Sequence, residues 1–94
     1  MRLVVASPDL SLYHLQMPTV LRSGPYRFFF YAGDQDEPPH VHVERDDCQA
    51  KVWLDPVLLE RSYGFARKEV NKILKLVAEH QQELLEGWHE FFHG

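Results

Sequence analysis

Two histidines and a glutamate occupy alternate positions in residues 37–44, which read Glu-Pro-Pro-His-Val-His-Val-Glu. Successive side chains of an extended strand point to opposite faces, so His40, His42 and Glu44 share one face if this segment is a strand. Neutral imidazoles and a carboxylate are ligands for zinc, nickel, manganese or iron. The row therefore predicts a divalent-metal site, and no other cofactor is expected. The candidates for a further ligand are Asp34, Asp36 and His80.

The same two histidines suit a different chemistry, the metal-independent cleavage of RNA. An unperturbed imidazole titrates at about pH 6.5, so it can accept and donate a proton near neutral pH. His40 and His42 would act as general acid and base, and Arg27 or Lys51 would stabilise charge on the phosphate. A third interpretation involves no chemistry: a polar sheet face whose Pro-Pro turn positions a partner-binding edge. The sequence leaves these interpretations open, and with them whether the protein is an enzyme.

Three aromatic residues are expected on the same outer face as the histidines. They are Phe29, Tyr31 and Trp53, and with Glu44 they form a predicted binding surface. Exposed aromatic patches mark protein interfaces, and aromatic rings also stack on the bases of single-stranded RNA. Residues 1–16 or a second copy of the chain in a homodimer are alternative covers for this patch.

Residues 40–54 are typical of a β-hairpin. Strands are expected over 40–45 and 48–54, joined by a turn at Asp46 and Asp47. This turn sets the register, since a slip of one residue would exchange the two faces. The expected pairs are Val43 with Ala50, Val41 with Val52, His42 with Lys51, His40 with Trp53 and Glu44 with Gln49. A strand over 26–32 is expected beside the hairpin, because consecutive strands usually neighbour one another.

From Phe65 onward the apolar residues recur every three or four positions, which predicts one amphipathic helix of about seven turns. Gly87 is the position at which this helix could break, and residues 57–64 are expected to be a connector. The apolar stripe consists of Val70, Ile73, Leu74, Val77, Leu84, Leu85, Trp88 and Phe92. The predicted fold class is α+β: a small antiparallel sheet of three or four strands packed on one long C-terminal helix. The stripe should cover the valine face of the sheet.

Length and composition indicate one small globular domain. The chain has 94 residues, a formal net charge of −4 and one cysteine, Cys48. The negative charge argues against indiscriminate nucleic-acid binding, which uses a basic surface. A single cysteine excludes an internal disulfide and no apolar run approaches membrane-spanning length, so a cytoplasmic protein is expected. We expect residues 1–16 to be an extension that is dispensable for folding, and residues 17–94 to be the domain.

Several segments of the chain fit the pattern of a known family. They are Met17-Pro18-Thr19, the aromatic run 27–31, the Pro-Pro-His-x-His-Val-Glu core within 37–44, residues 50–56 and residues 83–88. In these segments the chain from Met17 to the end resembles the bacterial family called domain of unknown function 4160. This family has no established biochemical role, and its genes are often paired with a small neighbour from domain of unknown function 2442.

The resemblance implies a component of a toxin–antitoxin-like module that acts through protein–protein contact with a small cognate partner. A small histidine-dependent ribonuclease and a divalent-metal-binding protein are the alternatives. RNA and a second copy of the chain are further possible partners, whereas a membrane is not expected.

Overall fold

The structure is a computed structural model that describes residues 19–93. The expected extension, residues 1–16, and the expected domain start at Met17 lie outside the described residues. Within the described part of the chain, no helix combines the length and the apolar character needed to cross a membrane.

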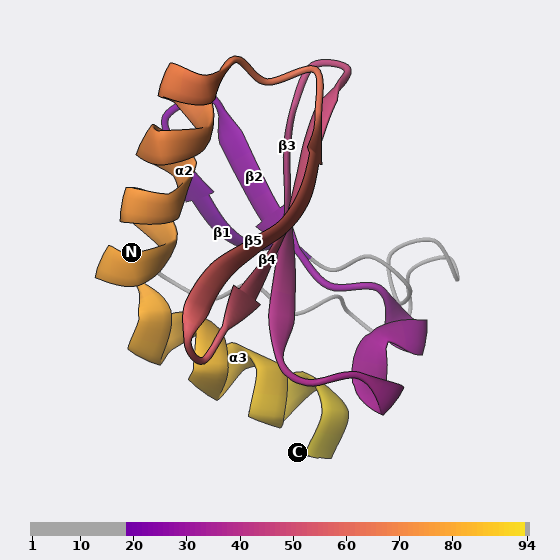
Figure 1. The fold of residues 1–94 in the computed structure, drawn as a ribbon. Helices are drawn as coiled ribbons and strands as arrows, with labels where there is room; N and C mark the ends of the chain where they lie inside the picture. The colour runs from indigo at the N-terminus through magenta and orange to yellow at the C-terminus, as the bar shows by residue number, and fades with distance from the viewer. Residues whose placement is uncertain (1–18, 94) are drawn as a thin grey trace.

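One antiparallel sheet of five strands, in the order β1-β2-β3-β4-β5, forms the centre of the fold (Figure 1). The strands are β1 (Thr19–Ser23), β2 (Tyr26–Phe29), β3 (His40–Arg45), β4 (Cys48–Leu54) and β5 (Val57–Tyr63). The α+β class is confirmed, but the expected three or four strands become five because residues 57–63 are a strand and not a connector. Val57 and Leu59 pair with Leu54 and Val52 of β4 and pack against the core, so they extend its apolar face.

The hairpin of β3 and β4 has the predicted register at every expected pair. Val43 lies opposite Ala50, Val41 opposite Val52 and His42 opposite Lys51, and β2 lies beside β3 as expected. Asp46 takes the left-handed conformation, with φ of 54°, that a tight two-residue hairpin turn requires. The register therefore sets the valines on one face of the sheet and the polar row on the other.

The helical part of the chain is two helices instead of one. They are α2 (Arg67–Glu79) and α3 (Gln81–His93), and a 3-10 turn, η1 (Ala32–Asp36), precedes β3. The break falls at His80 and not at Gly87, which is buried within α3. His80 leaves the helical conformation, with φ of −110° and ψ of 18°, and its carbonyl accepts the N–H of Leu84, so it ends α2 and leads directly into α3. His80 Nδ1 also lies 2.9 Å from Glu83 Oε1.

The break at His80 decides what each helix covers. α2 runs along one side of the sheet, and α3 turns across its end, where η1 also lies (Figure 1). Ile73 and Val77 of α2 and Leu84 of α3 are fully buried, while Val70 and Leu74 of the predicted stripe are half-buried. Ile73, Leu74, Val77 and Leu84 share one core with the predicted sheet residues Val41, Val43, Ala50 and Val52. Beyond the break, Trp88 of α3 reaches Phe30, with ring centroids 5.3 Å apart.

A charged clamp ties the hairpin to the first turn of α2. The guanidinium of Arg45 donates to Glu69 through Nε at 2.6 Å and through Nη2 at 2.8 Å, and the Tyr26 hydroxyl donates to Glu69 Oε2 at 2.8 Å. Two parallel donors from one guanidinium make a strong, directional contact. Through these bonds, first from Arg45 and then from Tyr26, the pKa of the Glu69 carboxyl is held below its usual range.

Replacing Val77 by Asp should unfold the domain. Val77 has no exposed surface, so the new carboxylate would be buried without a partner at a cost of several kcal/mol. Lys75→Asp, at an exposed position of the same helix, is the matched control and should change the midpoint little. Thermal unfolding followed by circular dichroism measures both variants; a Val77→Asp protein that melts like wild type would place the helix elsewhere.

Replacing Glu69 by Gln should flatten the acid limb of the stability curve. A carboxyl whose pKa is lower in the folded chain stabilises the fold above its unfolded-state pKa of about 4.3, and this contribution fades as the pH falls through the folded value. The difference in unfolding free energy between wild type and Glu69→Gln should therefore be largest near pH 7 and shrink below about pH 4. Urea unfolding across this pH range measures it, with Glu79→Gln at an exposed position as control. A pH-independent difference would contradict the clamp.

Candidate functional site

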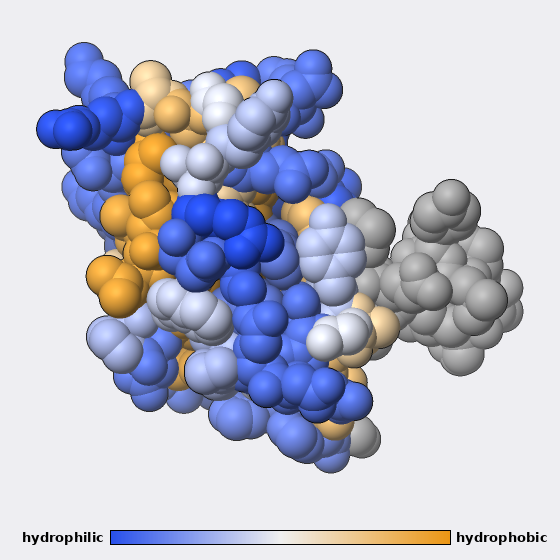
Figure 2. Space-filling model, turned by 45° about the vertical axis from the view of Figure 1, so that its right-hand side comes forward, coloured by the Kyte–Doolittle hydropathy of each residue, from blue (hydrophilic) through white to orange (hydrophobic). Residues whose placement is uncertain are grey.

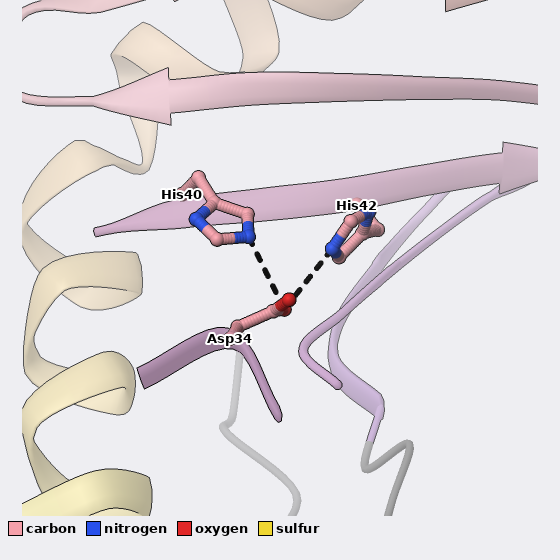
Figure 3. A group of neighbouring side chains, drawn as sticks. All are labelled: Asp34, His40 and His42. Carbon is pink, nitrogen blue, oxygen red and sulfur yellow. Dashed lines mark hydrogen bonds and ion pairs between the residues drawn. The ribbon is translucent and has the colours of Figure 1, made fainter. Parts of the chain in front are cut away.

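Asp34, His40 and His42 converge on one point at the end of the sheet (Figure 3). Oδ2 of Asp34 lies 3.2 Å from Nε2 of His40 and 3.0 Å from Nε2 of His42. One ligand atom from each of the three residues lies within 4.8 Å of the others. The histidines come from β3 and the carboxylate from η1, so a strand and the turn before it make the cluster.

Local structure fixes each of the three side chains. The alternation along β3 puts His40 and His42 on one face, two residues apart. Two hydrogen bonds link Asp34 of η1 to Tyr31. The Tyr31 N–H donates to Asp34 Oδ2 at 2.8 Å, and the Asp34 N–H donates to the Tyr31 carbonyl at 3.0 Å. This reciprocal pair holds the carboxylate over the histidines by its own backbone.

The protonation of His40 follows from its surroundings. Its Nδ1 lies 2.9 Å from the carbonyl oxygen of Pro38, and because a carbonyl can only accept, Nδ1 carries a proton. In a neutral ring Nε2 is then a bare lone pair. The His40 side chain is fully buried, and Nε2 has no aligned hydrogen-bond partner among the described residues. Its neighbour is the Asp34 carboxylate, so a proton or a cation is needed between the two.

The Asp34 carboxyl is ionised at neutral pH. Its partial burial raises the pKa, but hydrogen bonds from His40 and His42, when each ring carries a proton on Nε2, and from the Tyr31 N–H outweigh this and hold the pKa well below its usual range. Only 13% of the Asp34 side chain is exposed. A negative charge is thus held in a largely dehydrated place between two imidazoles, where electrostatic interactions are strong.

Aromatic side chains wall in both imidazoles. The His42 ring stacks on Phe29, with centroids 5.5 Å apart, and meets the Tyr31 ring edge-on at 4.6 Å. The His40 ring contacts Trp53 of β4 at 5.4 Å and Trp88 of α3 at 5.1 Å. These contacts fix the orientation of the rings and keep water away from them.

The expected aromatic surface differs from the prediction in one residue. Phe29 was expected to be exposed for binding, but only 1% of it is exposed, because the Arg27 guanidinium covers its ring at 4.2 Å and Tyr31 packs against it. Tyr31 and Trp53 stay half-buried and so keep part of their surface in solvent. Phe29 therefore supports the His42 ring by stacking on it, and the rings of Tyr31 and Trp53 border the cluster.

Glu44, the third member of the predicted metal row, lies with Arg27 instead of with the histidine nitrogens. Arg27 Nη1 is 3.3 Å from Glu44 Oε2, and Arg27 Nε donates to the Thr19 hydroxyl at 2.6 Å. Arg27 and Glu44 lie opposite each other on β2 and β3, two residues along each strand from the pair of Phe29 and His42. Neither belongs to the group of ligand atoms at Asp34.

Lys51 lies directly across from His42 on β4, but its ammonium group is bound to an acidic residue. Its Nζ donates to Glu37 Oε1 at 2.6 Å and lies 4.9 Å from the centre of the Trp53 ring. This bond is the main reason why the pKa of Glu37 is lowered. Glu37 Oε1 is also 3.8 Å from His40 Nδ1, so a chain of charges runs from Lys51 to the buried histidine. A phosphate held by Lys51 would have to compete with Glu37.

The sequence left three candidates open for a further ligand, and the structure brings one of them to the histidines. Asp34 lies there, Asp36 is exposed, and His80 contacts Glu83 at the start of α3. All the acidic positions of the loop look alike in sequence. The distinguishing signal is the spacing between Tyr31 and Asp34, which suits a side chain that caps its own turn.

Comparisons with known proteins give one finding. The sequence pattern of a family described as a domain of unknown function (DUF4160) matches residues 26–89, which include β2 to β5, the cluster and most of both helices. The curated proteins and the solved structures yield no match.

Proposed function

This chain belongs to the family of the domain of unknown function DUF4160, and on that premise we propose that it binds one divalent metal ion between Asp34, His40 and His42. The observation that carries the proposal is Nε2 of His40. In the neutral ring this buried nitrogen carries a lone pair that points at a carboxylate. No described residue offers it an aligned hydrogen-bond donor. A cation would satisfy both groups at once.

The donor set suits a transition metal. Imidazole nitrogens favour zinc, iron, nickel and copper, and a carboxylate adds a charge that offsets part of the charge of the ion. Two imidazoles and one carboxylate leave coordination positions open for water or a substrate, as in catalytic sites. An ion held here would activate a bound water or polarise a substrate oxygen.

The surroundings meet the other requirement of a metal site, which is orientation of the ligands. His40 is held from behind by the Pro38 carbonyl and Asp34 by the Tyr31 N–H. Outer contacts of this kind fix the tautomer and ring direction of metal-binding histidines. The three ligand atoms already lie within 4.8 Å of one another, and an ion about 2.0–2.2 Å from each would draw them slightly closer.

Metal titration should show one saturable site. Isothermal titration of metal-free protein with zinc, manganese and nickel should give about one equivalent at micromolar ion, with affinity falling below about pH 6.5 as protons compete for the imidazoles. Asp34→Asn and His42→Gln should weaken binding by more than the roughly 10–100-fold that loss of an outer contact costs.

Glu44→Gln is the matched control for this titration, because it removes a carboxylate of the same sheet face that pairs with Arg27. It should bind the ion like wild type. Equal losses in Glu44→Gln and Asp34→Asn, or an absence of saturable binding in wild type, would contradict the proposed centre.

Contact with a small cognate partner, in a module of the toxin–antitoxin type, is the second candidate function. The pairing of this family's genes with a small neighbour supports it, and so do Tyr31 and Trp53, which stay partly exposed beside the cluster. Partly exposed aromatic rings are enriched at protein interfaces. Histidine-dependent cleavage of RNA remains the alternative for the same place.

Paired variants separate contact from cleavage. Trp53→Ala should weaken binding of the product of the neighbouring gene by about 2 kcal/mol or more, while a His40→Gln/His42→Gln double variant should still bind it. Calorimetry measures binding, and a single-stranded RNA is the substrate for cleavage. If Trp53→Ala binds like wild type, the contact lies elsewhere. If the double variant loses a cleavage activity by roughly 10²–10⁴ per imidazole, the ribonuclease replaces the binding module.

A further inference from the structure

β5 is an edge strand that exposes large apolar side chains. Among the described residues, the exposed large hydrophobic ones are Leu58, 58% exposed, and Tyr63, 75% exposed, and both belong to β5. A surface view of one side of the molecule shows apolar atoms gathered along one border of an otherwise hydrophilic face (Figure 2). Of the devices that commonly protect edge strands, residues 57–63 contain one charged pair, Glu60 and Arg61, but no lysine or proline.

A bulge brings the two exposed side chains to the same face of the sheet. In a regular strand Leu58 and Tyr63, five positions apart, would point to opposite faces. The register slips at Glu60, so that Lys51 pairs with Arg61 while Val52 pairs with Leu59. Leu58 therefore lies opposite Trp53, and Tyr63 opposite Gln49, which are on one face of β4.

This arrangement is self-complementary under a two-fold axis. We propose that a second copy of this chain pairs with β5 in antiparallel fashion, with the axis between Glu60 and Arg61, so that Leu58 of one copy lies opposite Tyr63 of the other. Residues directly opposite in an antiparallel pair point to the same face, and the bulge satisfies that condition here. Both exposed apolar side chains of each copy are then covered, and the two sheets become one.

Charge at the centre of the pairing is balanced. The axis sets Glu60 of each copy opposite Arg61 of the other, and within each copy Glu60 Oε2 accepts from Arg61 Nη1 at 2.6 Å. The centre thus contains two cations and two anions, and each guanidinium can also donate to Glu60 of the second copy. Isologous interfaces require such self-matching patches.

The opposite edge of the sheet lacks these features. Its strand, β1, buries its large apolar residues Val20 and Leu21, with 3% and 0% exposed. An edge without exposed apolar side chains gains little by pairing. The asymmetry between β1 and β5 favours one contact and a closed dimer, not an open chain of sheets.

Cross-linking tests the register. In a Cys48→Ala background, which removes the native thiol, Leu58→Cys and Tyr63→Cys chains are prepared separately and then mixed under mild oxidation. Opposite Cβ atoms in an antiparallel pair lie about 4.5–5.5 Å apart, so the mixture should form a disulfide-linked dimer and neither variant alone should do so. Cross-linking within one variant alone, or none in the mixture, would overturn the pairing.

The mass in solution tests the dimer itself. Sedimentation equilibrium of the full wild-type chain should show a monomer–dimer equilibrium, and Leu58→Lys should shift it to monomer while circular dichroism stays unchanged. Gln82→Lys, which adds the same charge at an exposed position of α3, should dimerise like wild type. A wild-type chain that is monomeric at the highest soluble concentration, or equal dissociation of both variants, would overturn the proposal.

Discussion

A single hydrogen bond, from His40 Nδ1 to the Pro38 carbonyl, determines the chemistry of the whole site. It fixes which nitrogen of the ring carries the proton, and so it turns Nε2 toward Asp34 as an acceptor in the neutral ring. The two prolines that end the acidic loop put this carbonyl two residues before the histidine. The fold around it, from η1 to Trp88 of α3, keeps the ring dry and in one orientation. Without that bond, the cluster would be an ordinary polar contact.

Around this centre the charges are arranged in pairs. Lys51 with Glu37 and Arg27 with Glu44 flank the histidines on either side, and their opposite charges offset one another. The negative charge of Asp34 contacts the two imidazoles and a backbone N–H, and the Glu37 carboxylate is near enough to repel it. A site in which the flanks are neutral and the middle is anionic suits a cation more than an anion. For that reason we favour metal binding over direct phosphate binding by the histidines.

The hairpin and its register were predictable because a two-residue turn and alternating side chains leave one self-consistent pairing. The burial of the core valines and of the stripe residues Ile73, Val77 and Leu84 could be predicted from the spacing of apolar residues alone. Three features did not follow. The helix breaks at His80, β5 forms with Leu59 against the core beside Val52, and Phe29 is buried under the Arg27 guanidinium and Tyr31. β5 depends on a tertiary contact, which local patterns do not encode. The contacts at His80, Phe29 and Asp34 are local, but the periodicity of apolar residues does not show that they form.

The most direct test of this account is nitrogen-detected NMR of the histidine rings in metal-free protein and after one equivalent of zinc. Before zinc, His40 should carry its proton on Nδ1, as the Pro38 contact requires. After zinc, the Nε2 resonances of His40 and His42 should shift together in slow exchange, while those of His80, His89 and His93 stay in place. A proton found only on Nε2 of His40, or equal shifts in all of the rings, would contradict a metal centre at Asp34, His40 and His42.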